Sequence, residues 1–204
     1  MEAIKPIDKG LGDIKEATIH PITDKIGLLP RDLELSLFED KLSGNWGKCN
    51  DGDEAAFRII SSFYRIIKTA GNNSNADFCV IDIGPNFGAI NRATLIAADF
   101  VVVPMAADLF SLQGLKNLGS RLEKWRNEWT KRKSENPEPT LELPNSDIEP
   151  IGYLIMHHSI KESRPVKSYI RWARRIPQVF RKFVLKQPFD SNIKVVDGLY
   201  CMRF

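Results

Sequence analysis

Long hydrophobic runs are absent from this sequence of 204 residues. No stretch reaches the roughly 18 apolar residues that a membrane-spanning helix needs. The opening MEAIKPIDKG also lacks the apolar block of a secretory signal. These absences argue against a membrane-spanning segment and lead us to expect a soluble, cytoplasmic protein.

Cysteine and histidine are scarce as well. Cys49, Cys79 and Cys201 are odd in number and show neither CxxC nor Cys/His spacing, which argues against a disulfide framework and a zinc site. We expect three ordinary reduced thiols. The sequence also shows no Ser/His/Asp arrangement and no paired carboxylates at a spacing typical of another class of hydrolase.

The length of the chain and its 43% of hydrophobic residues suit one core. A chain of this size buries roughly 70% of the surface that its unfolded form exposes, and it is short for two domains. We therefore expect residues 1–204 to form a single domain.

The first part of the chain predicts a hairpin followed by a helix. ATIHPITDKIGLLP, residues 17–30, contains two short β-type runs around Thr23-Asp24. DGDEAAFRIISSFYRIIKTAGNN follows at 51–73, with apolar residues at helical spacing. Asp51 or Asp53 is expected to cap this helix, and Gly71 to end it.

Three apolar runs of strand length, at 78–83, 100–106 and 151–157, alternate with helical patterns. Near-continuous apolar runs are typical of strands covered on both faces, so we expect a mainly parallel sheet. A long helix is predicted over about 109–133. Another is predicted to begin at Pro165, and Pro177 should kink or end it. The alternation predicts an α/β fold of three layers.

Asp82 ends the first of these apolar runs. In open parallel sheets, ligands bind beyond the carboxyl ends of the strands. A carboxylate there can hold Mg²⁺, directly or through a water, beside a nucleotide phosphate, as at a Walker B position. The alternative from the residues alone is that Asp82 only caps the next helix.

An ordered set of short motifs surrounds Asp82. VIDIGPNFGAINRATLIAADFVVVPMAADLFSLQGLKNL holds Asp82 with Pro85, then Ala98-Asp99 before an apolar run that reaches Pro104, and then LFSLQGL at 109–115. In this order the set resembles the second half of the ParA/MinD family of partition ATPases, over roughly residues 78–118. LLPRDLELSLFEDKLS at 28–43 and IGYLIMHHS at 151–159 extend the resemblance more loosely.

The resemblance implies a P-loop-NTPase-like fold that sandwiches ATP and Mg²⁺ in a homodimer. It makes Asp82 the Walker B residue, catalytic and metal-binding, and it makes Gly84, Pro85 and Asn86 the switch loop that senses the γ-phosphate. Glycine or proline there suits a loop that must approach phosphate closely. His157 and His158 fall where relatives place residues near the base, although a structural role is the favoured interpretation.

The phosphate-binding signature GxxxxGK[ST] is missing from the sequence. GNWGKC at 44–49 is the nearest match, but Leu42 replaces the first glycine, Cys49 replaces the hydroxyl residue, and no strand precedes it. The resemblance thus predicts a partial ParA-like domain with an incomplete fold, also short at its C-terminal end. A truncated gene product, an experimentally shortened chain and a naturally reduced homologue all fit. We expect ATP and Mg²⁺ to bind weakly or not at all, and the chain alone not to hydrolyse ATP.

Positive charge is concentrated late in the chain, although the formal net charge is only +3. Residues 161–186 contain nine Lys and Arg against one Glu, whereas residues 1–160 contain 18 basic and 23 acidic residues. Five basic residues fall at a spacing that would place them along one helical face: Arg164, Lys167, Arg171, Arg174 and Arg175. Two interpretations of these basic residues stay equally open. They could form a solvated helix face, or the nonspecific DNA-binding surface for which partition ATPases are known. Trp172 lies between these residues in the sequence and is expected to pack in the core.

Two functions from different classes follow. One is a ParA-like ATPase of plasmid or chromosome partitioning that lacks its P-loop and is inactive alone. The other is a non-catalytic regulatory module of the same fold, which binds DNA, a second copy or a complete paralogue. An unrelated α/β enzyme using Asp82 as acid or base is the weakest alternative. A sheet without a central P-loop strand would expose unpaired backbone, so dimerisation or strand exchange is expected.

Overall fold

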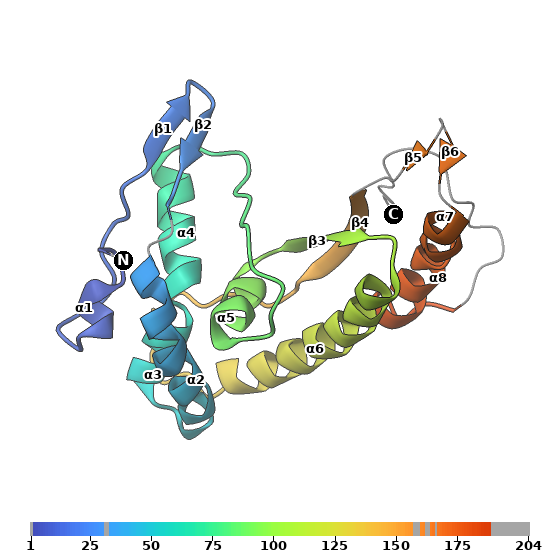
Figure 1. Ribbon diagram of the computed structural model, residues 1–204. Helices are drawn as coiled ribbons and strands as arrows, with labels where there is room; N and C mark the ends of the chain where they lie inside the picture. The colour runs from blue at the N-terminus through green and yellow to red at the C-terminus, as the bar shows by residue number, and fades with distance from the viewer. Residues whose placement is uncertain (1, 31–32, 157–159, 162–163, 166, 189–204) are drawn as a thin grey trace. The chain divides into compact units, whose positions relative to one another are not determined.

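The computed structural model describes residues 2–30, 33–156, 160–161, 164–165 and 167–188 (Figure 1). The chain forms two compact units. The helical unit consists of Met1–Ala98 and Arg126–Asp147, and the sheet unit consists of Asp99–Trp125 and Ile148–Phe204.

The helical unit begins with a short helix and the expected hairpin. α1 spans Lys5–Asp8, and β1 (His20–Thr23) pairs antiparallel with β2 (Ile26–Leu28). The hairpin residues are exposed, so the hairpin lies outside the core. The other elements of this unit are helical: η1 (Leu33–Leu37), α2 (Phe38–Lys48), η2 (Cys49–Asp51), α3 (Glu54–Ile60), α4 (Ser62–Asn73), α5 (Ala89–Ala97) and the second part of α6 (Leu109–Lys133).

Tryptophans form the centre of the helical unit. Trp46 of α2 stacks on Trp129 of α6 with ring centroids 5.8 Å apart, and Phe57 of α3 lies 6.1 Å from the Trp129 ring. Arg132 donates to the Trp46 carbonyl at 2.8 Å. The guanidinium groups of Arg92 and Arg132 lie 4.1 and 4.5 Å from the centre of the Trp46 ring. Aromatic and cation–π contacts of this kind stabilise α2 against α5 and α6.

The helix expected over residues 51–73 is present but interrupted. Asp53 caps it, because its carboxylate accepts a hydrogen bond from the Ala56 N–H at 3.1 Å. A break between α3 and α4 follows, where the Ser62 hydroxyl donates to the Ile59 carbonyl at 2.8 Å. Such bonds back to the preceding turn bend helices. α4 then runs two residues beyond Gly71, the predicted stop.

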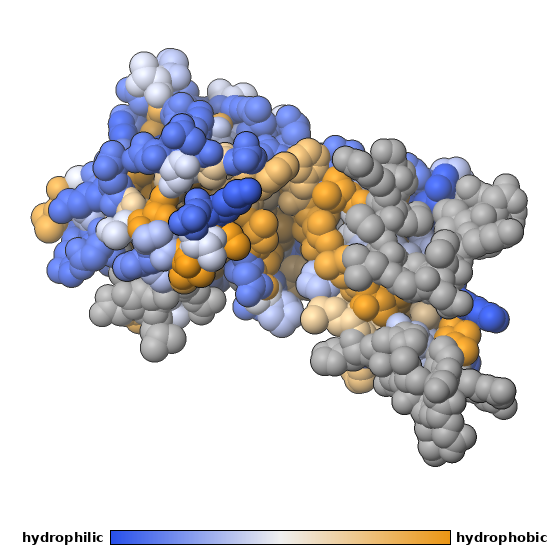
Figure 2. Space-filling model, turned by 90° about the horizontal axis from the view of Figure 1, so that it is seen from above, coloured by the Kyte–Doolittle hydropathy of each residue, from blue (hydrophilic) through white to orange (hydrophobic). Residues whose placement is uncertain are grey.

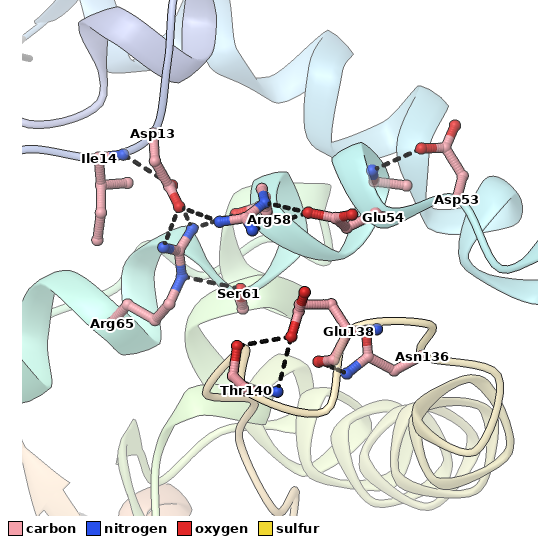
Figure 3. A network of polar contacts seen from close by, with 11 residues as sticks. Asp13, Ile14, Asp53, Glu54, Arg58, Ser61, Arg65, Asn136, Glu138 and Thr140 are labelled. Carbon is pink, nitrogen blue, oxygen red and sulfur yellow. Dashed lines mark hydrogen bonds and ion pairs between the residues drawn. The ribbon is translucent and has the colours of Figure 1, made fainter.

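A polar network ties the segment before the hairpin to α3 and α4 (Figure 3). The Asp13 carboxylate accepts hydrogen bonds from Arg65 at 2.7 and 2.8 Å and from Arg58 at 2.5 Å. Arg58 also donates to Glu54 at 2.8 Å, and Arg65 donates to the Ser61 hydroxyl at 3.1 Å. The network fixes the segment around Asp13 on the surface of two helices.

The sheet unit is built on two parallel strands (Figure 1). β3 (Phe100–Ala106) pairs with β4 (Glu149–Met156), from Phe100 opposite Glu149 to Ala106 opposite Met156. Both strands and α6 lie where the sequence predicts them, and the parallel direction is confirmed. Side chains from the strands and helices of this unit form its core, including Met105, Leu112, Leu115, Tyr153, Ile176 and Phe180.

Short elements complete the sheet unit: β5 (Ile160–Lys161), β6 (Arg164–Pro165), α7 (Lys167–Ala173), α8 (Ile176–Val179) and the π-helix η3 (Phe180–Val184). Pro165 lies in β6, so its prediction as the first helical residue is wrong. The fixed φ of proline suits a short edge strand as well as a helix start. Pro177 lies in the first turn of α8, and the helical pattern is broken before it, as predicted.

The strand predicted at 78–83 does not form, and Asp82 therefore does not end a paired central strand. Among the described residues, the sheets are β1–β2, β3–β4 and β5–β6, and none includes this segment. An apolar run becomes a stable strand only where a neighbouring strand satisfies its backbone groups. Phe78 and Val80 are 89% and 93% exposed. Figure 2 shows that hydrophobic residues reach the surface on the face seen from above.

The fold class is the predicted one, a mixed α/β fold with a parallel sheet, although that sheet is small. Across the described ranges, no helix is both long enough and apolar enough to cross a membrane.

Candidate functional site

The loop from Asp82 to Gly88 lies in the helical unit. It joins residues 78–83, called the unpaired segment because they belong to no described sheet, to α5. It contains the four residues that are predicted to bind the nucleotide and the metal ion. Asp82, Pro85 and Asn86 are exposed, and Gly84 is half-buried. The structure thus places these residues together in one turn at the start of a helix.

Asn91 holds this loop in shape. It lies in the first turn of α5 and is only 4% exposed. Its Nδ2 donates to the Gly84 carbonyl at 2.6 Å and to the Asn86 carbonyl at 2.7 Å. Asn86 Oδ1 accepts in turn from the Gly88 N–H at 2.9 Å. Sequence reasoning missed Asn91, and the available signal was a polar residue among the apolar positions of a predicted helix.

Glu39 reaches the start of α5 from α2. Its Oε1 accepts from the Ala89 N–H and its Oε2 accepts from the Ile90 N–H at 2.9 Å. A carboxylate is favourable there because the first N–H groups of a helix carry partial positive charge. Gly88 allows the approach, since a Cβ at that position would lie 2.5 Å from Glu39 Oε1. Sequence reasoning missed Glu39, which lies 50 residues from its partner.

GNWGKC at 44–49 is not a phosphate loop, as predicted. Gly44, Gly47 and Lys48 lie in α2, where backbone N–H groups serve the helix. Cys49 is buried, and burial raises the pKa of its thiol to about 12. This segment therefore offers ATP no cradle of free amides and no metal-binding hydroxyl.

The Asp82 carboxylate could supply one ligand to a magnesium ion, but not a complete binding site. Mg²⁺ commonly binds one or two carboxylates and keeps water and phosphate oxygens as its other ligands. In the part of the chain that the structure describes, no group of three or more His, Cys, Asp or Glu side chains could hold a metal ion by itself.

The five basic residues predicted to bind DNA do not share one helical face. Arg164 lies in β6, Lys167 is the first residue of α7, and α7 ends at Ala173. Arg174 and Arg175 lie in the turn before α8. The spacing argument assumed one continuous helix, and the chain breaks that helix ahead of Pro177.

Three of these residues are exposed: Arg171, Arg174 and Arg175. Trp172 packs on the core of the sheet unit, as expected, and is only partly buried. The guanidinium groups of Arg171 and Arg175 lie 5.5 and 5.1 Å from the centre of its ring. His157 and His158 lie outside the described residues.

The Asp82 loop, α5 and β3 lie in a part of the chain that a family model of the P-loop NTPase-like class matches. A family model described as an AAA domain, AAA_31, matches residues 7–135. The chain belongs to this AAA domain family, which is related to ParA and MinD.

Curated relatives and a solved structure are similar to the chain. It is 23% identical over 164 residues to the uncharacterized protein MJECL24 of Methanocaldococcus jannaschii, covering 80% of this chain and 53% of that protein. It is 25% identical over 113 residues to the uncharacterized protein Rv1708 of Mycobacterium tuberculosis, covering 55% of this chain and 31% of that protein. The chain thus spans about half or less of the length of these relatives.

The crystal structure of protein DIP2308 from Corynebacterium diphtheriae superposes with a TM-score of 0.68 at 20% identity, covering 92% of this chain and 65% of that one. At this identity the likeness shows a shared fold.

Proposed function

We propose that the chain supplies the Asp82 carboxylate and the Gly84–Asn86 switch loop of a ParA-like ATPase domain that acts in DNA partitioning. The observation that carries the proposal is the loop itself. A buried Asn91 fixes two of its carbonyls while Asp82 stays exposed. Membership of the AAA domain family supports the same assignment.

Asp82 would hold Mg²⁺, which neutralises charge on nucleotide phosphates when it is bound. The phosphate-binding lysine, the amide cradle and the metal-binding hydroxyl have no counterpart at GNWGKC. Phosphoryl transfer depends almost wholly on such positioning and charge neutralisation. The chain alone should therefore neither bind Mg-ATP tightly nor hydrolyse it.

The test measures phosphate release and thermal stability with Mg-ATP, first on the chain alone and then with a complete family member that carries GxxxxGK[ST]. We expect no turnover and no thermal shift alone, because a ligand stabilises only the state it binds. In the mixture we expect more Mg-ATP to be bound than by the complete family member alone. Asp82→Ala should remove the increase, whereas Asp77→Ala, at an exposed acid nearby, should leave it.

Asp82-dependent turnover by the chain alone would reveal an overlooked phosphate-binding loop and reject the inactive assignment. An increase in the mixture that survives Asp82→Ala would reject the metal-binding role.

A second candidate is the non-catalytic binding module. The observation that favours it is the unpaired segment 78–83, which presents Phe78 and Val80 to solvent at alternate positions. Exposed segments that pair with no strand can accept one from a partner. A second copy of the chain or a complete paralogue is the partner we propose.

A further inference from the structure

The loop containing Asp82 is anchored at a distance by Glu39. α5 has no acidic residue in its first turn, and its N-cap, Gly88, has no side chain to cap it. The two N–H groups of Ala89 and Ile90 are satisfied instead by the half-buried carboxylate of Glu39, from α2. Without Glu39, these two donors lose the acceptor that the structure gives them.

The hydrogen bonds continue from Glu39 into the loop. Ala89 and Ile90 directly precede Asn91, whose side chain holds the carbonyls of Gly84 and Asn86. A shift at the start of α5 would therefore move the Asn91 amide relative to both carbonyls. The position of the loop depends on the bond between α2 and α5.

A second link joins the same two helices further along. Arg92 of α5 lies over the Trp46 ring of α2 at 4.1 Å and donates a long hydrogen bond to the Leu42 carbonyl at 3.5 Å. This link can hold α5 on α2 when the Glu39 bonds are broken. Loss of Glu39 should then release the loop and leave the packing of the helices in place.

We propose that Glu39 is a positioning residue that latches the resting conformation of the Asp82 loop to α2. A ligand or partner that moves the loop together with the first turn of α5 would break the two Glu39 hydrogen bonds, so α2 would sense that movement. An effect of this latch on nucleotide binding rests on the proposed function, whereas the hydrogen bonds of the latch do not.

The test is hydrogen exchange and NMR on the full chain without nucleotide. Glu39→Ala should speed exchange at the Ala89 and Ile90 N–H groups by about tenfold or more, because each loses a charged acceptor. The two side-chain N–H signals of Asn91 should change with them. Glu39→Gln, which keeps one acceptor oxygen, should give an intermediate result. Asp40→Ala, at the exposed neighbouring acid, should change neither.

Two results would overturn the latch. Unchanged exchange at Ala89 and Ile90 would mean that the Glu39 bonds are absent in solution. Equal acceleration throughout α3, α4 and α5, in Glu39→Gln as well as in Glu39→Ala, would mean that Glu39 stabilises the whole unit and not the loop. A failure of Asp82 to act on Mg-ATP leaves these measurements unaffected, so the two proposals fail separately.

Discussion

The structure stabilises the negative charge of Asp13. Partial burial pushes the pKa of its carboxyl up, but hydrogen bonds from Arg65 and the Ile14 N–H, the charge of Arg65 and a hydrogen bond from Arg58 outweigh burial and lower it to about 2. The Arg65 side chain is only 11% exposed, so its charge depends on this partner. The ionised form of Asp13 therefore contributes to folding stability.

Replacing Asp13 by Asn should lower the free energy of unfolding at pH 7 by about 1–2 kcal/mol, a value reduced for partial exposure. Because the folded pKa lies below the ordinary value of 3.8, the stabilisation is present above about pH 4 and is lost as the pH falls toward 2. Urea unfolding from pH 7 to pH 2.5 measures this. The difference from wild type should shrink at low pH, and Asp24→Asn, at an exposed acid, serves as the matched control.

Among single residues, the sequence suggests only candidates that lie close together in the chain, and the roles of Asp82 and Gly84–Asn86 stay predictions. Asp82 and Gly84–Asn86 follow one another in the chain, so their common loop can be read directly. Glu39 and Asn91 are different, because the partners of Glu39 are 50 and 51 residues away and the amide of Asn91 acts only after α5 has folded back on the loop. Such contacts depend on tertiary structure, which no short motif encodes.

At the scale of elements, two glycines of α6 offer a matched comparison. A Cβ at Gly119 would overlap the backbone carbonyl of Phe183, whereas a Cβ at Gly114 would meet no atom within 4 Å. Gly119→Ala should therefore destabilise the protein by about 1–3 kcal/mol, because backbone cannot yield as a side chain does. Gly114→Ala should stabilise it by up to about 1 kcal/mol through helix propensity. Denaturant unfolding of both variants checks this, and equal effects would contradict the close approach of α6 and η3.

The elements differ in how well the sequence predicts them, for a physical reason. β3, β4 and α6 have both a strong pattern and a neighbour to pack against, and they appear as predicted. Residues 78–83 have an equally strong strand pattern but no strand beside them in the described structure. The helix of 51–73 is predicted correctly apart from its break, where the Ser62 hydroxyl bonds the Ile59 carbonyl.

At the scale of the whole molecule, charge predicts weak and salt-sensitive DNA binding. Arg171, Arg174 and Arg175 are exposed around Trp172 and can reach phosphates without sharing a helical face. The logarithm of affinity should fall with the logarithm of salt concentration by about 0.9 per contacted phosphate. Gel shifts at low salt measure this. Replacing the three arginines by Ala should weaken binding and flatten the slope, and an unchanged slope would contradict a DNA surface here.

The exposed apolar segment predicts self-association of the whole chain. Phe78 and Val80 are almost fully exposed, and burying such residues is favourable by about 1.5–3 kcal/mol each. Light scattering over a range of protein concentrations should show a dimer that Phe78→Ser and Val80→Ser weaken. A monomer at high concentration would count against the binding-module candidate.

The unpaired segment 78–83 is also a place where the folded chain is open to proteolysis. Proteases cleave most readily where exposed backbone is not held in regular structure. Phe78 is as exposed as Phe110, at 89% and 87%, but Phe110 lies within helix α6. Chymotrypsin at low concentration should therefore cut after Phe78 before it cuts after Phe110, and a bound partner strand should suppress the cut at Phe78, so that the cleavage rate becomes a measure of occupancy.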